Sequence, residues 1–117
     1  MQDRPVITTA IPRRRYQIGE FAATLLADIE SGDTRRFRYI VAFVPLGQGE
    51  PTLYVCAEEG TADEAGGCCQ LVLVNEVMTE RLDADARWGD QEAFAEQAIR
   101  LGVQVLGLQQ EQVVRLL

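Results

Sequence analysis

The side chains of this chain that could do chemistry are carboxylates, three cysteines and eleven arginines, because the sequence contains neither histidine nor lysine. The missing histidines remove the commonest general base and the usual zinc ligand. The missing lysines remove Schiff-base chemistry and the phosphate-binding lysine of a P-loop. The only serine, Ser31, lies in a predicted turn and lacks the context of a nucleophile elbow. We therefore expect no catalytic residue and no cofactor, and we favour a non-enzymatic role over a carboxylate- or thiol-based enzyme.

The three cysteines lack the spacing of a metal site. Cys68 and Cys69 are neighbours, so on a strand their side chains point to opposite faces. Structural zinc sites use a fourth soft ligand and C-x-x-C spacing, and the sequence offers neither. We predict no metal site and interpret the cysteines as small buried thiols in a reducing cytoplasm. The alternative is a reactive thiol site at Cys56 or Cys68.

Two acidic residues are spaced like a catalytic carboxylate pair. Asp28 and Glu30 are two residues apart, which places both on one face of a strand. The next strand offers Arg38 and Arg36 as their cross-strand partners, and Glu58 on the strand after that also faces Arg38. We therefore predict structural ion pairs here instead of acid–base chemistry.

The first strand that must position these side chains has an ambiguous pattern. In residues 16–30 the apolar side chains match helical spacing and also strict alternation. Residues 35–45 are rich in aromatic and β-branched side chains and alternate as a strand does. Turn-forming residues lie between the two segments. We therefore interpret residues 16–30 as a strand that pairs with residues 35–45 in a hairpin.

The register of this hairpin follows from matching apolar positions. It places Leu25 opposite Val41 and Ile29 opposite Phe37, so that each inward side chain meets an apolar partner. A second hairpin sets Val41 opposite Val55 by the same reasoning. A slip of one residue would turn every side chain to the other face, so the register is strongly specified.

The C-terminal part of the chain is predicted to form a helix. Asp90 is a suitable N-cap, and Gly107 a suitable C-terminal stop. Gly102 lies on the apolar stripe, where a missing side chain allows helix and sheet to approach closely. The predicted fold is a single α+β domain, residues 1–117, with a four-stranded antiparallel meander and this helix on one face. Its segments are an N-terminal arm (1–15), four strands (16–30, 35–45, 51–59 and 68–78, together 16–78), an acidic connector (79–89), and a helical region (90–117) with a helix at 90–106 and a short piece at 109–117.

The other face of this sheet, here called the even face, is also apolar. One helix cannot cover both faces, and monomers rarely expose apolar patches above a few hundred Å². A second copy of the chain, a protein partner, a ligand or one of the two terminal segments is therefore expected to cover it. We predict self-association, as a homodimer, or binding of a protein partner through its central residues, which are Leu26, Ile40, Ala42, Val44, Tyr54, Val72 and Val74.

A small-molecule pocket is the alternative to an association surface. It would lie near Trp88, Tyr54 and Cys56, with Asn75 as a polar contact. The net charge of −7 disfavours nucleic acid, and the run Arg13 to Arg15 is interpreted as a solvated arm. A membrane span and a signal segment are not expected, which favours a cytoplasmic location.

Overall fold

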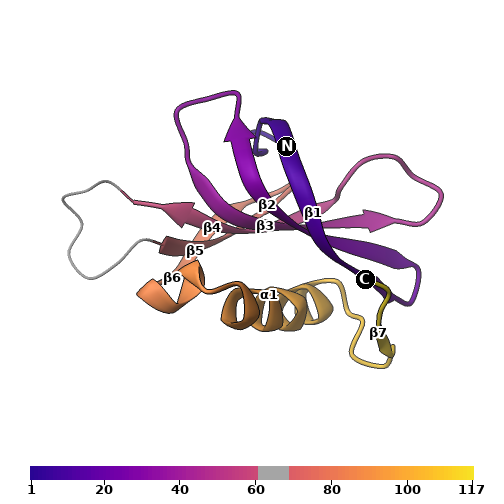
Figure 1. The fold of residues 1–117 in the computed structure, drawn as a ribbon. Helices are drawn as coiled ribbons and strands as arrows, with labels where there is room; N and C mark the ends of the chain where they lie inside the picture. Colours follow the sequence, from indigo (N-terminus) through magenta and orange to yellow (C-terminus); the bar gives the residue numbers. More distant parts are fainter. Residues whose placement is uncertain (61–68) are drawn as a thin grey trace.

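The computed structural model describes residues 1–60 and 69–117, which form one antiparallel sheet with a helix packed against it (Figure 1). The strands follow one another across the sheet in the order β6-β5-β4-β3-β2-β1-β7, so only β7 lies away from its neighbour in sequence. The elements are β1 (Ile7–Ile18), β2 (Phe21–Ser31), β3 (Phe37–Pro45), β4 (Leu53–Glu59), β5 (Cys69–Asn75), β6 (Thr79–Ala84), the 3₁₀ turn η1 (Ala86–Gly89), α1 (Gln91–Val105) and β7 (Val113–Arg115).

The expected α+β class is confirmed, but the four-stranded sheet is wrong because the described residues contain seven strands. The predicted N-terminal arm is mostly β1, and the predicted strand 16–30 contains the end of β1 as well as β2. Gly19 explains the division, because its φ of +56° allows a two-residue turn in which Ile18 pairs with Phe21. The acidic connector contains β6, and the terminal helical piece contains β7.

Both predicted hairpin registers are present at the centre of the sheet. Leu25 pairs with Val41, and Val41 pairs with Val55 on its other side. The first ladder ends at Leu26 and Ile40, however, so the predicted pairing of Ile29 with Phe37 is wrong. Beyond this point β2 continues to pair with β1 but no longer with β3.

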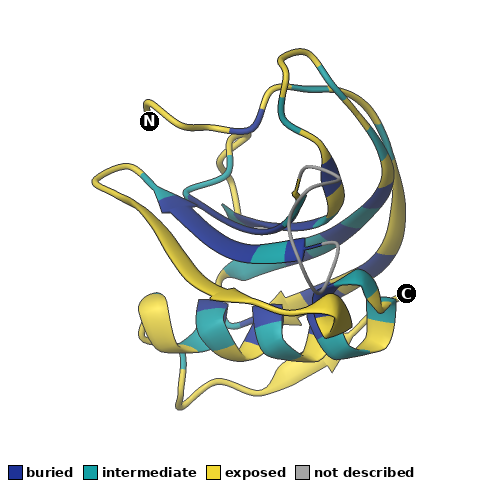
Figure 2. Cartoon of the chain, turned by 90° about the vertical axis from the view of Figure 1, so that its left-hand side faces the viewer, coloured by how far each residue is buried: buried dark blue, intermediate teal, exposed yellow. Residues whose placement is uncertain are grey.

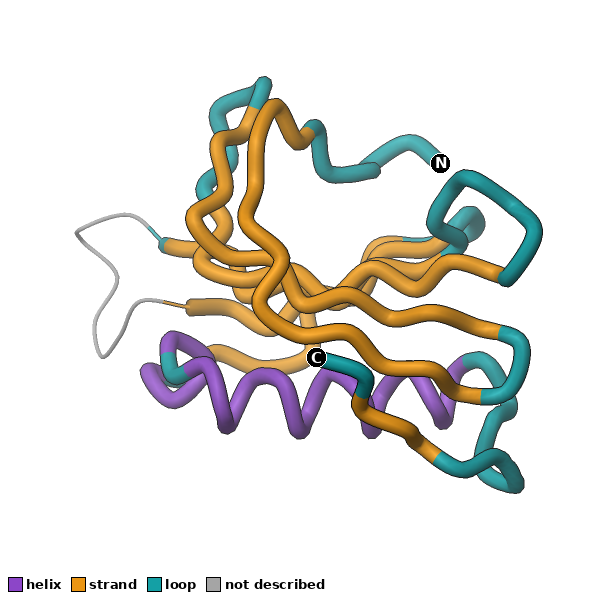
Figure 3. The backbone as a smooth tube through the Cα atoms, turned by 45° about the vertical axis from the view of Figure 1, so that its right-hand side comes forward, coloured by secondary structure: helices purple, strands orange, loops and turns teal. Residues whose placement is uncertain are grey.

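A single residue marks the place where β2 and β3 part. Asp28 has a φ of +49°, a conformation that is uncommon for residues other than glycine. A strand residue in this conformation interrupts the regular alternation and redirects the strand, much as a bulge does. Figure 3 shows the far ends of β1 and β2 rising away from the side of the sheet that carries the helix.

The helix agrees with its prediction in its ends and in its packing. The Asp90 side chain accepts a hydrogen bond from the Ala93 backbone at 2.9 Å, and Gly107 follows the C-cap with a φ of +68°. Phe43 lies so close to Gly102 that a Cβ there would be 2.1 Å from the ring. Figure 2 shows α1 with its buried side turned toward the sheet and its exposed side turned outward.

The sheet has an apolar core on each face. On the helix side, Phe43, Leu25 and Val55 pack with Phe94 of α1 in one buried cluster. A second cluster lies on the even face and includes Ile40, which is fully buried. In Figure 3 the N-terminal segment, residues 1–6, crosses on the side opposite to α1. The molecule therefore places its own chain on both faces of the sheet.

Candidate functional site

The predicted ion-pair residues find other partners than expected. Asp28 pairs with Arg13 of β1 at 2.6 Å, because the two strands remain together after β2 leaves β3. Arg38 lies 4.0 Å from Glu59 instead of pairing with Asp28. These exposed pairs line an open, polar pocket of about 530 Å³ at the place where β2 and β3 part. Exposed ion pairs contribute little to stability, typically about 0–1 kcal/mol.

The remaining members of the predicted ion pairs also lie elsewhere. Glu58 is 3.3 Å from Arg81 of β6, across the intervening strand. The backbone oxygen of Arg36 accepts a hydrogen bond from the backbone of Glu59 at 2.7 Å. Glu30 is exposed at the end of β2, where it pairs with Thr9 in the ladder. The predicted contact between Glu30 and Arg36 depended on continued β2–β3 pairing, which the structure lacks.

The residues of the predicted small-molecule pocket lie on opposite faces of the sheet. Trp88 is buried in the helix-side core, and its indole N–H donates to Asp83 at 3.1 Å. Tyr54 and Cys56 belong to the even-face core. Asn75 closes the turn between β5 and β6, where its Oδ1 accepts from two backbone N–H groups. The structure therefore does not bring these side chains together as one site.

The two described cysteines differ in their oxidation state. Cys56 is a free thiol with no exposed surface, and this burial raises its pKa far above the ordinary value. A thiol in this environment stays protonated and unreactive. Cys69 is disulfide-bonded, so the interpretation of all three cysteines as buried thiols is wrong for this residue. Cys68 lies outside the described residues, and the cytoplasmic location stays a prediction.

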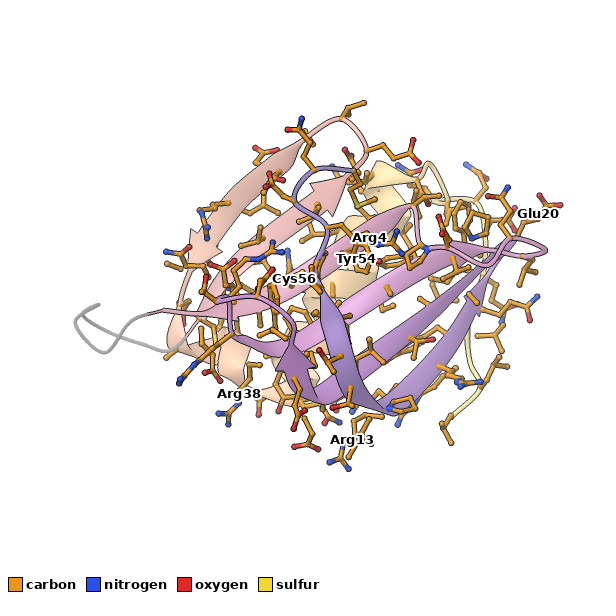
Figure 4. All side chains as sticks on the ribbon, turned by 90° about the horizontal axis from the view of Figure 1, so that it is seen from above. Arg4, Arg13, Glu20, Arg38, Tyr54 and Cys56 are labelled. Carbon is orange, nitrogen blue, oxygen red and sulfur yellow. The ribbon has the colours of Figure 1, made fainter. Side chains whose placement is uncertain are left out.

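The predicted association face is filled from within the chain. The N-terminal segment crosses it, and the Arg4 guanidinium donates to the Tyr54 hydroxyl at 3.1 Å. Figure 4 shows Arg4, Tyr54 and Cys56 close together on this side. Arg35 anchors the segment by donating to the backbone oxygens of Asp3 and Arg4. All of the predicted interface residues are buried or partly buried here, namely Leu26, Ile40, Ala42, Val44, Tyr54, Val72 and Val74.

A groove on the helix side combines apolar walls with charged side chains. It lies between α1 and the edge of the sheet formed by β1 and β7, and its volume is about 550 Å³. We call it the α1–β7 groove. Its lining comprises Arg14, Tyr16, Glu92, Ala95, Glu96, Ile99, Arg100, Val103, Val113 and Arg115.

Arg14 is the charged residue set most deeply into this groove, since only 9% of the residue is exposed. Its Nη2 donates to the Glu92 carboxylate, and its Nη1 lies 3.4 Å from the Tyr16 hydroxyl. The hydrogen bond with Glu92 is the main reason why the pKa of Arg14 is raised. The Nε of Arg14 is enclosed and has no hydrogen-bond partner within residues 1–60 and 69–117. The guanidinium is therefore a buried charge whose donors are incompletely satisfied.

The other charges of the groove lie nearer its rim. Arg100 pairs with Glu96 one helical turn away, at 3.2 Å. Glu92 sits in the first turn of α1, and its pKa is lowered mainly by the hydrogen bond from Arg14 and further by the charges of Arg14 and Arg115. Arg14 and Arg115 thus act on the same carboxylate.

No family model matches this chain. No curated protein and no solved structure matches it. Across the described residues, His, Cys, Asp and Glu do not gather in groups of three or more that could hold a metal ion. Where the structure describes the chain, its helices are too short or too polar to cross a membrane.

Sequence reasoning missed Arg14, the central residue of the groove. The run Arg13 to Arg15 was predicted to be a solvated arm, whereas β1 places Arg13 outward and Arg14 inward. The sequence contains a signal for this, because Arg14 has the same parity as the apolar residues Tyr16 and Ile18. In the structure all three residues are buried. Alternation along a strand turns only every second side chain of a basic run to solvent.

Replacing Glu92 by glutamine should reduce the loss of stability in acid. Arg14 holds the pKa of Glu92 below its ordinary value, so the pair contributes fully above that ordinary value and is lost as the pH falls through the lowered pKa. We expect the urea midpoint to fall less between about pH 6 and pH 2 in the variant than in the wild type. Glu76→Gln, at an exposed position, is the matched control. An equal fall in both variants would contradict the assignment.

Proposed function

We propose that this protein is a ligand-binding domain that holds a small, largely apolar molecule in the α1–β7 groove. The observation that carries this proposal is the combination of an apolar groove of about 550 Å³ with a buried guanidinium in its lining. Sites for small molecules usually have about 300–1,000 Å³ and a few well-placed polar groups among apolar ones. The α1–β7 groove meets both conditions.

The charged groups of the groove support binding over proton-transfer catalysis. The pKa of Arg14 is raised and that of Glu92 is lowered, each mainly by the hydrogen bond that joins them. Both groups therefore keep their charges at neutral pH, whereas a general acid or base works best with a pKa near the working pH. Such a pair can orient a ligand by its charge without exchanging a proton with it.

The groove can be tested by filling it. Val103 lines the groove from α1, so Val103→Trp should block it, whereas Val105→Trp on the same helix lies outside it at an exposed position. We expect 1-decanol and decanoate, titrated as separate probes, to shift the backbone NMR signals of the groove residues in the wild type and in the Val105 variant. Val103→Trp should lower the apparent affinity derived from these shifts by about tenfold or more, which corresponds to about 1.4 kcal/mol. If both probes leave these signals unchanged in the wild type, the proposal fails.

Association with a partner through the even face stays a prediction. The N-terminal segment occupies that face through its contacts with Tyr54 and Arg35. A second copy or another protein would have to displace this segment first. Exclusion of nucleic acid likewise rests on the net charge of −7.

A further inference from the structure

We infer that the ligand of the α1–β7 groove is an amphipathic anion, with one anionic head group held at Arg14 and an apolar body laid along α1. This inference rests on the proposed binding function and adds the chemical class of the ligand. A carboxylate, a sulfate or a phosphate ester on an alkyl or ring system has this chemistry.

The head group follows from the incomplete pairing of Arg14. The side chain of Arg14 is 10% exposed, but that of its ionic partner Glu92 is 70% exposed. A buried charge is stabilised only when its partner and its remaining hydrogen bonds are well placed. Here the enclosed Nε has no acceptor among the described residues, and the Glu92 carboxylate that pairs with the guanidinium is itself mostly exposed to solvent. A ligand anion that displaces Glu92 would give Arg14 a partner inside the groove, while the Glu92 side chain turns into water.

The charges around Arg14 favour an anion in the same place. The groove is lined by three arginines and two glutamates, although the chain as a whole carries a net charge of −7. Glu96 already neutralises Arg100. Arg14 and Arg115 then remain with Glu92, whose pKa is lowered by both of their charges, so the lining of the groove carries one more positive than negative charge. An anion that enters it is attracted by two guanidinium groups, and a cation is repelled by them.

The apolar body follows from the wall that α1 presents. Ala95, Ile99 and Val103 are spaced at i, i+4 and i+8, so they form one continuous row on the helix. The row extends for about 12 Å at the helical rise of about 1.5 Å per residue, with Ala95 fully buried at its base, Ile99 9% exposed and Val103 half-buried. It begins one turn after Glu92, and Val113 of β7 faces it from the sheet edge. A medium-length alkyl chain fits this row when its head group lies at Arg14.

Three probes with the same ten-carbon chain separate the head group from the body. These are decanoate, 1-decanol and decyltrimethylammonium, titrated below their micelle concentrations and followed by NMR shifts of the groove residues. We expect decanoate to bind at least about tenfold more tightly than 1-decanol, and the cation to bind more weakly than both. The preference for decanoate should shrink as salt is raised, because salt screens partly exposed charges.

Two arginine variants and a control test the assigned residues. Arg14→Gln should abolish the preference for decanoate while leaving the affinity for 1-decanol within about twofold, and Arg115→Gln at an exposed position should reduce the preference without threatening the fold. Arg87→Gln, on η1 and outside the groove, should change nothing. Equal binding of decanoate and 1-decanol in the groove would overturn the anionic class but leave the binding function intact. Binding of neither probe would overturn both.

Discussion

Replacing Gly102 by valine is expected to lower the free energy of unfolding by about 3 kcal/mol, near the upper end of what overpacking costs. A Cβ at this position would lie 2.1, 2.3 and 2.8 Å from the Cζ, Cε2 and Cε1 atoms of Phe43. Phe43 is fully buried at the centre of the sheet, so its ring has no free space into which it can move. Helix propensity alone predicts the opposite sign, because glycine is among the poorest residues in a helix. The sign of the measured change therefore separates steric packing from propensity.

The control for this experiment is a glycine in open space. A Cβ on Gly49 would have no atom within 4 Å, so Gly49→Val should leave stability nearly unchanged. Urea unfolding gives the free energies, and the combination of Gly102→Val with Phe43→Leu should recover part of the loss, since the two positions touch. A Gly102→Val protein as stable as the wild type would mean that α1 does not approach the sheet as described.

Removing residues 1–6 should expose the even face and destabilise the protein. Tyr54 would lose the hydrogen bond from Arg4, and Arg35 would lose its two backbone acceptors on Asp3 and Arg4. The part-buried hydrogen bond between Arg4 and Tyr54 contributes about 1.5–3 kcal/mol, and the two exposed hydrogen bonds of Arg35 add less, so we expect a loss of roughly 2–4 kcal/mol in the free energy of unfolding. The fully buried Cys56 thiol provides the readout, because it should become accessible to an alkylating reagent. Mass spectrometry of the peptide that contains Cys56 measures the rate.

The same deletion tests the predicted association surface. If the even face can pair with a second copy, the shortened protein should form dimers in light scattering, whereas the full chain stays monomeric at the same concentration. Removal of residues 1–2 alone is the control, because the hydrogen bonds that anchor the segment begin at Asp3. An unchanged alkylation rate of Cys56 after removal of residues 1–6 would show that other parts of the chain cover the face.

Several elements were predictable from the sequence because short-range patterns specify them. Leu25 and Val41 face each other since both strands alternate and a slip of one residue would bury polar side chains. Asp90 and Gly107 end the helix through contacts within a few residues. Gly102 was predictable as a close approach because a glycine on the apolar stripe of a helix has no side chain to pack.

The tertiary structure decided the extent of the sheet and the position of its edges. In the sequence, residues 7–15 resemble a polar arm. In the fold they form most of β1, because they pair with the edge of β2 that does not pair with β3. Asp28 has an ordinary strand context in sequence, whereas in the fold its φ is +49° and the β2–β3 ladder stops two residues earlier, at Leu26 and Ile40. That departure replaced the predicted partner of Asp28, Arg38, with Arg13.

The candidate site depends on contacts between residues that are far apart in the chain. Arg14 and Glu92 are separated by 78 positions, and Val113 reaches the groove only because β7 returns to pair with β1. Local sequence patterns were enough to predict the paired centre of the sheet, the limits of the helix and the apolar nature of both sheet faces. The fold decided which segment covers each face and which arginine becomes buried. Local patterns set the direction of a side chain, whereas its partner depends on how distant segments pack.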